Sequence, residues 1–262
     1  MSSTPENQVQ HADGKPRAQE SDWYNEHYKT SGMEPSAQPL VEPELSRHLG
    51  PWYGFALPEL RKTLRPNHRL LELGCGTGRL PTQLYREGLI PQENLFGIDQ
   101  SAVAIEQAKR TLSKANFGVG DIYDLKFPKE HFNYVMLMEV IEHLESPDHA
   151  LKQIWSVTAP NGYLFISFPN FVHLPWLAVR ILSEKLNKPN WIVLQPIDKI
   201  YTVWDVRRLA EKAGFVFEGG IGSNYGPPLL FHLERPWMAR CLNKLGLWWT
   251  SFHPILVFRK KA

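Results

Sequence analysis

The sequence has little of several features that would fix its class at once. It holds only two cysteines, Cys75 and Cys241, so no disulfide framework is implied and a reducing compartment is favoured. Lys and Arg number 29 against 27 Asp and Glu, and this near balance provides no basic field for nucleic acid. No apolar run approaches the roughly 20 residues that a bilayer-spanning helix needs. Residues 1–20 lack the apolar centre of a signal peptide, so we expect a cytoplasmic protein.

What the sequence does contain is an alternation of strand-like and helix-like patterns. Between residues 69 and 169, short apolar runs alternate with stretches of helical periodicity. The expected strands cover 69–73, 94–98, 116–119, 131–138 and 163–168, followed by 215–221 and 254–260. Such an alternation predicts an α/β fold whose largely parallel sheet is covered by helices on both faces. Ligands in sheets of this kind bind beyond the carboxyl ends of the strands.

The domain organisation follows from composition and from the lengths of the connections. Residues 1–20 are polar, so we expect a disordered tail ahead of a single domain at 21–262. Two stretches, 170–201 and 225–251, are too long for plain connections and mix aromatic, aliphatic and basic residues. They can be helices packed on the core, a lid over an apolar substrate, or a surface for a membrane or a second copy. The sequence leaves these interpretations and the oligomeric state open.

A glycine-rich turn follows the first expected strand, where residues 70–80 read LLELGCGTGRL. Three glycines alternate with other residues in this turn: Gly74, Cys75, Gly76, Thr77 and Gly78. Glycine leaves the backbone bare, so a ligand can approach the chain closely there. The dinucleotide fingerprint G-x-G-x-x-G would place its last small residue at Arg79, whose bulk opposes close packing of helix and strand. An NAD-dependent dehydrogenase is therefore disfavoured.

The pattern E-x-G-x-G-x-G, which begins at Glu72, resembles the first motif of the Rossmann-like, class I S-adenosylmethionine-dependent methyltransferases. The resemblance covers residues 66–169 well and 202–262 more loosely. It implies a seven-stranded, mostly parallel sheet with an antiparallel last strand. It also implies that the glycines let the backbone approach the methionine part and the ribose of S-adenosylmethionine. Glu72 would help to orient the ammonium group of this cofactor.

Carboxylates after the second and third strands extend the resemblance. Asp99 ends the second strand, and its oxygens can accept hydrogen bonds from a ribose diol, although Asp99 could also cap the helix that follows. The resemblance implies that Asp121 accepts a hydrogen bond from the adenine amino group and that Ile122 packs on the ring. The remaining cofactor-binding candidates near these strand ends are Cys75, Gln100, Met138 and Glu139.

Two tyrosines, Tyr24 and Tyr28, precede the core and lie one helical turn apart. Related enzymes carry an N-terminal aromatic helix that closes over the cofactor, with tyrosine hydroxyls that reach its carboxylate. The resemblance therefore implies that both tyrosines bind the cofactor. A helix that Trp23 and Tyr24 dock on the core without touching any ligand is the alternative.

Three polar residues, Glu139, Glu142 and His143, follow the fourth strand in the stretch MEVIEHL. Their spacing predicts that they share one face of a helical turn. Two carboxylates and an imidazole can bind a divalent cation. The pattern E-x-x-E-H is similar to that of ubiquinone-biosynthesis O-methyltransferases and of small-RNA 3′-terminal 2′-O-methyltransferases. The RNA enzymes add a later histidine, which residues 195–202 lack, so a further ligand would come from elsewhere, such as His173.

Three roles for this catalytic set stay open. Glu139, Glu142 and His143 can together hold a metal ion. His143 can act as a general base without metal, with Glu139 near the cofactor. All three can also be structural.

The most consistent function is methyl transfer from S-adenosylmethionine to a hydroxyl of a small, fairly apolar acceptor, as in the ubiquinone-biosynthesis branch. N-methylation of a small amine, metal-dependent RNA 2′-O-methylation and a non-catalytic methyltransferase-like subunit are the alternatives. The near-neutral charge makes nucleic acid a poor candidate partner. Peripheral membrane contact through the two amphipathic stretches is compatible with this function.

Overall fold

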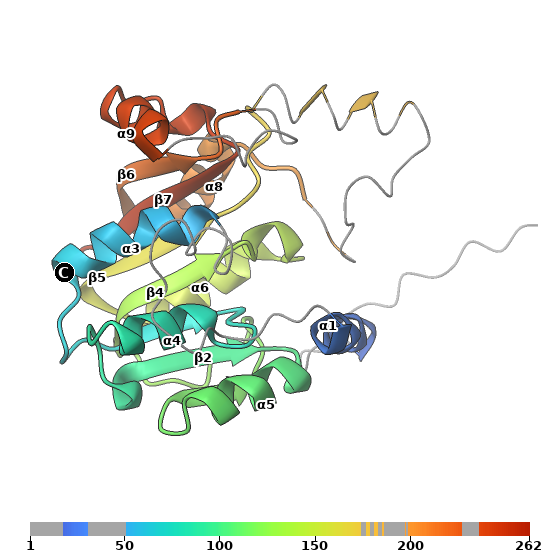
Figure 1. Ribbon diagram of the computed structural model, residues 1–262, viewed down its shortest axis with the longest axis vertical. Helices are drawn as coiled ribbons and strands as arrows, with labels where there is room; N and C mark the ends of the chain where they lie inside the picture. The colour runs from blue at the N-terminus through green and yellow to red at the C-terminus, as the bar shows by residue number, and fades with distance from the viewer. Residues whose placement is uncertain are drawn as a thin grey trace, which may run out of the picture.

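A seven-stranded sheet forms the centre of the protein in the computed structural model (Figure 1). The structure describes residues 18–30, 51–173, 199–226 and 236–262, together with the single positions 177–178, 181–182, 185 and 197. The strands lie in the order β3-β2-β1-β4-β5-β7-β6. Their bounds are β1 Leu70–Leu73, β2 Leu95–Asp99, β3 Asn116–Val119, β4 Phe132–Met138, β5 Thr158–Ser167, β6 Phe215–Ser223 and β7 His253–Lys260. Strands β1 to β5 are parallel and β7 is antiparallel to both of its neighbours. The predicted fold class is confirmed.

Helices cover both faces of the sheet. Their bounds are α1 Ala18–Thr30, α3 Pro51–Thr63, α4 Arg79–Arg86, α5 Ala102–Thr111, α6 Pro147–Val157, α8 Val203–Lys212 and α9 Pro236–Lys244, with short 3-10 turns η1 Gln92–Asn94, η2 Ile141–His143 and η5 Trp248–Thr250. One core joins α3, α4 and α5 to Leu70 and Met136. The other joins α6 and α8 to Leu71 and Val135. Alternate residues of the buried strands thus serve opposite faces, as the period of two requires.

Helix starts follow the local signals in the sequence. Ser101 caps α5, since its hydroxyl oxygen accepts a hydrogen bond from the Ala104 backbone N–H at 3.2 Å. A capping box precedes α8, because Thr202 and Asp205 each accept a hydrogen bond from the other's backbone N–H. These caps fix where each helix leaves the carboxyl edge of the sheet.

The fifth strand differs from its prediction. We expected the strand to start at 163, but β5 begins at Thr158. Thr158 pairs with Phe132 of β4, and the regular register resumes only at Tyr163. Asn161 adopts the left-handed conformation with φ 62°, which makes this segment a bulge inside the strand.

The expected tail and insertions are only partly within the described residues. Residues 1–17 lie outside them, and α1 begins at Ala18, so the last three residues of the predicted tail are helical. Most of the 170–201 stretch also lies outside the described residues. The 225–251 stretch contributes α9 and η5. No described helix is both long and apolar enough to cross a bilayer.

Candidate active site

The turn after β1 is held against the end of β2 by backbone hydrogen bonds. The N–H groups of Gly74 and Cys75 both donate to the carbonyl of Ile98, at 2.8 and 3.0 Å. Gly74, Gly76 and Gly78 all have positive φ angles, of 70°, 51° and 74°. Residues with a Cβ rarely adopt this conformation, so the alternating glycines are a requirement of the turn itself.

Asp99 joins this turn to the next helix. Its Oδ2 accepts a hydrogen bond from the Gly76 N–H and its Oδ1 accepts one from the Ser101 N–H, both at 2.8 Å. Burial raises the pKa of Asp99, and the backbone N–H donors oppose that shift. Because Ser101 caps α5, Asp99 is not the helix cap. Each of its oxygens retains capacity to accept a further hydrogen bond, as a ribose diol requires.

Glu72 and Cys75 lie buried beside Asp99. Glu72 is only 1% exposed in the middle of β1, between Gly97 and Met136 of the flanking strands. Burial, followed by the charges of Asp99 and Glu72, raises the pKa of the Cys75 thiol well above its usual value. The neutral thiol packs over Gly97, where an added Cβ would come within 2.7 Å of its sulfur. Cys75 therefore offers its backbone, and not its side chain, to a ligand.

Helix α1 lies against α5, next to the glycine turn (Figure 1). Asn25 Oδ1 accepts hydrogen bonds from the Ser101 hydroxyl at 2.8 Å and from the Val103 N–H at 3.3 Å. A Cβ on Gly76 would come within 2.6 Å of the Tyr28 hydroxyl. Burial, then the charge of Asp99, raises the pKa of Tyr28 well above its usual value, so this hydroxyl keeps its proton and can donate it to a ligand.

Tyr24 is the other tyrosine candidate of α1. It is half-buried and packs edge-on against Trp23, with ring centroids 4.9 Å apart. Its charge contributes to the raised pKa of Tyr28, so the two hydroxyls face the same region.

The loops after β2 and β3 continue this arrangement. The Gly120 N–H donates to the Asp99 carbonyl at 3.1 Å. Asp121, the next residue after Gly120, therefore lies at the end of β3 beside the end of β2. Asp121 Oδ1 accepts from the Tyr123 N–H at 2.8 Å and is half-buried, as are Ile122 and Gln100. The strand ends of β1, β2 and β3 thus form one cradle with carboxylates at three successive positions. Each of them is a predicted cofactor-binding residue, and that role stays a prediction.

Glu139 belongs to a second polar group, at the ends of β4, β5 and β7. Ser167 donates its hydroxyl proton to Glu139 Oε1 at 2.7 Å, and its carbonyl accepts the Glu139 N–H at 3.1 Å. Oε2 lies 3.5 Å from His253 Nε2. The predicted helical face is wrong here, because Glu139 adopts a left-handed conformation with φ 55° and η2 begins only at Ile141.

The protonation of this group is set by burial. Burial raises the pKa of Glu139 to about 8, and the Ser167 hydroxyl partly opposes the shift. Burial, followed by the charge of His173, lowers the pKa of His253 to about 3. At neutral pH the favoured state is a protonated carboxyl beside a neutral imidazole. The two side chains are therefore neutral groups in proximity rather than an ion pair.

Glu142 and His143 face a different neighbour. His143 Nδ1 lies 2.7 Å from the carbonyl of Ile197, and its Nε2 lies 3.5 Å from Glu142 Oε1. The Glu142 carbonyl accepts the Lys199 N–H at 2.8 Å. The pair thus contacts Ile197 and Lys199, while Glu139 contacts Ser167. Within the part of the chain that the structure describes, no three His, Cys, Asp or Glu side chains are grouped so as to hold a metal ion.

His173 joins the Glu139 group rather than the Glu142 pair. Its Nε2 lies 3.2 Å from the Tyr225 carbonyl and its ring packs on Phe252. Burial lowers the pKa of His173. Its charge is one cause of the low pKa of His253, so the two histidines are neighbours.

Comparison with known proteins decides the family. The sequence profile of a methyltransferase domain family, Methyltransf_23, matches residues 47–218, well over half of the chain. The chain belongs to this methyltransferase family. Its domain is a class I S-adenosylmethionine-dependent methyltransferase, as the first motif predicted, and S-adenosylmethionine is the cofactor of that class.

Among relatives of this methyltransferase are two ubiquinone biosynthesis O-methyltransferases. The enzyme of Aeromonas salmonicida is 28% identical over 61% of this chain and 67% of its own length. The mitochondrial enzyme of Saccharomyces cerevisiae is 31% identical over 47% of this chain and 41% of its own length. The chain spans between 40% and 67% of the length of the first curated relatives that it matches.

The fold of the methyltransferase has close structural neighbours. The methyltransferase crystallised with the Haloferax volcanii Trm112 activator aligns with a TM-score of 0.63 at 16% identity. The alignment covers 91% of this chain and 98% of that one. At this identity the likeness concerns the fold.

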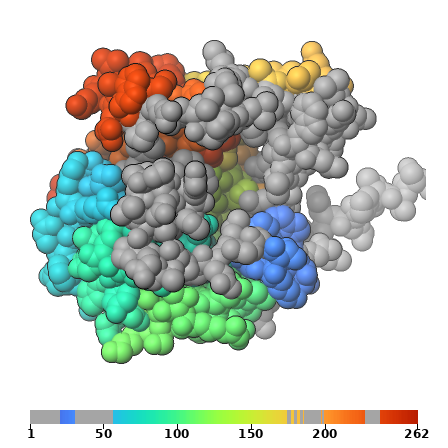
Figure 2. Space-filling view, viewed as in Figure 1, coloured from blue at the N-terminus to red at the C-terminus, as the bar shows by residue number. Residues whose placement is uncertain are grey.

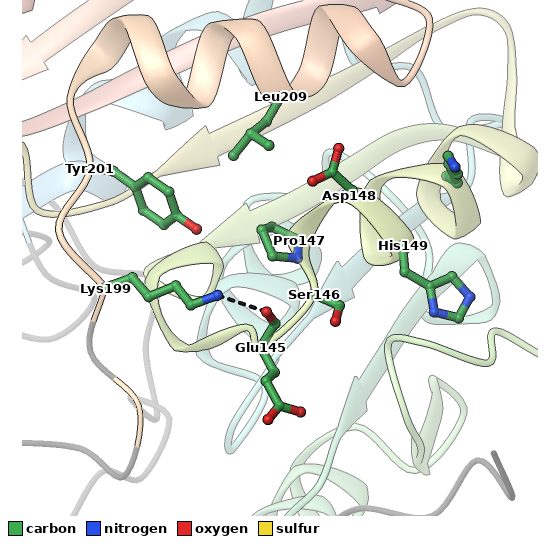
Figure 3. A pocket seen from close by; sticks show the side chains of 9 residues that line it. Glu145, Ser146, Pro147, Asp148, His149, Lys199, Tyr201 and Leu209 are labelled. Atoms are coloured by element: carbon green, nitrogen blue, oxygen red, sulfur yellow. Dashed lines mark hydrogen bonds between the residues drawn. The ribbon is translucent and has the colours of Figure 1, made fainter. Parts of the chain in front are cut away.

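A separate cavity of about 590 Å³ opens at the start of α6 (Figure 3). Its lining residues are Glu145, Ser146, Pro147, Asp148, His149, Lys152, Lys199, Tyr201 and Leu209. Lys199 Nζ donates to the Glu145 carbonyl at 2.7 Å across its mouth. None of these residues belongs to the cradle or to the Glu139 group.

The sequence interpretation missed Ser167 and His253. Ser167 is the polar end of an otherwise apolar strand, YLFIS, and such an ending was the only local signal. His253 comes from β7, whose position beside β5 depends on pairing between segments far apart in sequence. Nothing near either residue in the chain indicates that both contact Glu139.

Proposed function

We propose that the protein transfers a methyl group from S-adenosylmethionine to a hydroxyl of a small, fairly apolar acceptor. The observation that carries the proposal is the position of Glu139, which lies at the carboxyl end of β4 beside Ser167 and His253. Its pKa of about 8 makes it a base matched to a hydroxyl near neutral pH.

The cradle suits this cofactor on its own geometry. Gly76 has a bare backbone where a Cβ would collide with Tyr28, and the carboxylate of Asp99 lies directly beside it. Asp99 would accept hydrogen bonds from the ribose hydroxyls, and Glu72 would orient the ammonium group. Tyr24 and Tyr28 would cover the methionine part, while Asp121 and Ile122 would hold the adenine. S-adenosylmethionine supplies an electrophilic methyl group on a sulfonium.

The acceptor step needs alignment and the removal of a proton. The acceptor oxygen forms a bond to the methyl carbon as the bond from that carbon to sulfur breaks, and the sulfonium becomes a neutral thioether. The hydroxyl proton passes to the Glu139 carboxylate, which must be ionised beforehand. Ser167 holds the carboxylate through Oε1, and His253 faces Oε2. Alignment of the reacting atoms supplies most of the rate, and base catalysis adds roughly 10²–10⁴-fold.

His143 is the other candidate base. Both of its ring nitrogens already lie near oxygen atoms, of Ile197 and of Glu142, whereas Glu139 lies at the strand end itself. We therefore propose Glu139 as the base that accepts the proton of the acceptor hydroxyl. His143 and Glu142 would instead position Ile197 and Lys199. The chelator arm of the assay below tests whether a divalent cation takes part in the reaction.

Two comparisons support an oxygen acceptor. The relatives from Aeromonas salmonicida and Saccharomyces cerevisiae both bear the name ubiquinone biosynthesis O-methyltransferase. The near-neutral charge of this chain gives no support to an RNA acceptor. A small amine is the second candidate, because the ionised Glu139 carboxylate can also accept an amine's proton. The yeast relative is mitochondrial, and the cytoplasm stays our expectation for this chain.

A turnover assay across acceptor classes tests the proposal. The purified protein is given S-adenosylmethionine with simple phenols, small primary amines or short single-stranded RNA, with and without a chelator. We expect methylation of phenolic oxygen that the chelator does not abolish. Methylation confined to amines or RNA contradicts the proposal. Tight binding of S-adenosylhomocysteine without turnover on any acceptor would instead indicate a non-catalytic subunit.

A further inference from the structure

Helix α9 turns an apolar face away from the protein. Trp237 is 60% exposed, Leu245, just after the helix, is 72% exposed and Met238 is 40% exposed, and Cys241 between them is exposed as well. At 100° per residue these four side chains fall within one arc of the helix surface. The red-orange residues of α9 lie on the outside of the molecule in Figure 2. A contiguous exposed patch of this kind marks a contact surface.

The opposite face of α9 is fixed to the sheet, so the orientation of the helix is built into the fold. Asn243 Oδ1 accepts hydrogen bonds from the Gly222 N–H at 2.6 Å and from the Tyr225 hydroxyl at 2.9 Å. Its Nδ2 donates to the Gly222 carbonyl at 2.9 Å. Ala239, on the same side, is fully buried. With this face held down, the apolar arc cannot act as a lid that closes inwards.

Basic side chains border the exposed arc. Arg240 and Lys244 are both exposed and lie next to Trp237 on the helix surface. The stretch 236–251 contains these two cations and no Asp or Glu. An apolar arc with tryptophan at one edge and cations on that flank is the composition of helices that lie in the interface of anionic membranes. The tryptophan ring has the apolar body and the polar N–H that this interface favours.

The dimensions of α9 argue against a second copy as the occupant. A helix of nine residues is about 13 Å long. A stable protein interface buries roughly 800 Å² on each partner, which a helix of this length does not supply alone. Insertion of a few side chains into a lipid surface has no such threshold, because each apolar group contributes separately.

We propose that α9 is an interfacial anchor that docks the protein on an anionic phospholipid surface through Trp237, Met238 and Leu245, with Arg240 and Lys244 on the headgroups. The segment that carries α9 joins the end of β6 to the start of β7. Ser223 and His253 pair at that point, at the same edge of the sheet as Glu139. The anchor therefore holds the carboxyl edge of the sheet near the membrane, whichever acceptor is used.

Vesicle flotation tests the anchor without any knowledge of the acceptor. The full chain is mixed with vesicles of phosphatidylcholine, with or without phosphatidylglycerol. We expect binding to the anionic vesicles and much weaker binding to phosphatidylcholine alone. The double variant Arg240→Gln/Lys244→Gln should weaken anionic binding about 30-fold, since each cation near such a surface contributes about fivefold. Trp237→Ser/Leu245→Ser should weaken binding at least tenfold.

Matched variants elsewhere on the surface keep the test specific. Lys109→Gln/Arg110→Gln on α5 removes the same charge, and Tyr85→Ser on α4 removes an aromatic side chain that is 40% exposed. Both should float like the wild type. The proposal is overturned if no vesicle binds the protein, or if the α9 variants bind as well as the controls. A dimer in analytical ultracentrifugation that the α9 variants abolish would assign the face to a second copy and also overturn it.

Discussion

The two halves of the carboxyl edge are built in different ways. In the cofactor half, the carboxylate of Asp99 accepts hydrogen bonds from backbone N–H groups of its own loop and of the adjacent glycine turn. In the acceptor half, Glu139 contacts the side chains of Ser167 and His253, which arrive from two other strands. Backbone donors oppose the rise in pKa that burial causes at Asp99, whereas burial raises the pKa of Glu139 to about 8 and leaves its carboxyl protonated at neutral pH.

This difference teaches how one sheet edge can both bind and react. Under the proposed function, the cofactor half offers the Asp99 carboxylate, held by two backbone N–H donors, to the ribose. In the acceptor half, the pKa of Glu139 is about 8, close to neutral pH. Its carboxyl can therefore release or take up a proton readily. Variants that affect one half and spare the other test this division directly.

The largest effect is expected for Glu139→Gln, which removes the base and keeps the shape of the side chain. Turnover should fall roughly 10²–10⁴-fold, because base catalysis contributes that much, while the affinity for S-adenosylhomocysteine changes little. Steady-state kinetics and calorimetric titration measure the two effects. The companion variant His143→Ala should cost less. A larger loss of turnover in His143→Ala, again with normal cofactor binding, would move the base to His143, as the sequence pattern allows.

Gly76→Ala should abolish measurable cofactor binding, a loss of at least about 100-fold. The alanine would have to adopt φ 51°, and its Cβ would lie 2.6 Å from the Tyr28 hydroxyl. Both backbone strain and this collision therefore oppose the native turn. Gly88→Ala is the matched control, since Gly88 has φ 71° but nothing within 4 Å of its Cβ position. Calorimetry with S-adenosylhomocysteine should show wild-type affinity for the control. Equal affinity in both variants would show that the glycine turn does not contribute to cofactor binding.

Asp99→Ala should weaken S-adenosylhomocysteine binding by about 1–3 kcal/mol, the usual penalty for leaving a hydrogen-bonding partner unsatisfied. Asp99→Asn keeps one oxygen acceptor and should lose less. Titration calorimetry resolves both. Unchanged affinity in Asp99→Ala would show that the ribose lies elsewhere.

Asn25→Ala is expected to have a moderate effect, because it releases α1 from the start of α5. The loss of hydrogen bonds to Ser101 and Val103 should weaken cofactor binding about fivefold, and Asn25→Asp, which retains the oxygen acceptor, should restore it. The neighbouring exposed residue Glu26 provides the control, Glu26→Ala. If Asn25→Ala binds the cofactor like this control, α1 is docked independently of the cradle.

A further comparison of the two halves uses stability as a function of pH. The folded pKa of Glu139, about 8, lies above its ordinary 4.5, so its contribution to stability is full below pH 4.5 and is lost as pH rises through 8. The folded pKa of His253, about 3, lies below its ordinary 6.5, so its contribution is lost as pH falls from 6.5 towards 3. Between pH 4.5 and 6.5 the falling contribution of Glu139 and the rising contribution of His253 cancel, so the free energy of unfolding stays level there.

Thermal unfolding at pH 5.5 and pH 8.5 measures this balance. The wild type should lose more stability than Glu139→Gln between these values, because glutamine has no proton to release. Equal losses in the two proteins would mean that Glu139 does not have the raised pKa described above.

The sequence predicted best the features that a few neighbouring residues determine. The glycine turn, the carboxylate of Asp99 and the capping box of Thr202 and Asp205 all depend on contacts within one loop or between adjacent strand ends. The residue types alone predict these features. Glycine at such positions indicates a turn with positive φ, and a short acid indicates an acceptor for backbone N–H groups.

The acceptor half was less predictable because distant segments determine it. A helical turn was expected at Glu139, but its N–H is bound by Ser167 of β5, and the residue adopts a left-handed conformation instead. His253 reaches the group only because β7 inserts between β5 and β6. The early start of β5 has a similar cause, since its bulge is defined by the partner strand. No local pattern reports such pairing.

The double use of Asp99 limits how this protein can change over evolutionary time. The carboxylate that would recognise a ribose is also the clasp that closes the glycine turn, through the N–H of Gly76. A lineage that drifted towards a cofactor without a ribose diol would have no freedom to discard this acid first, since the turn would open before the new specificity was in place. Descendants of this chain should therefore diversify their acceptors far more readily than their methyl donor.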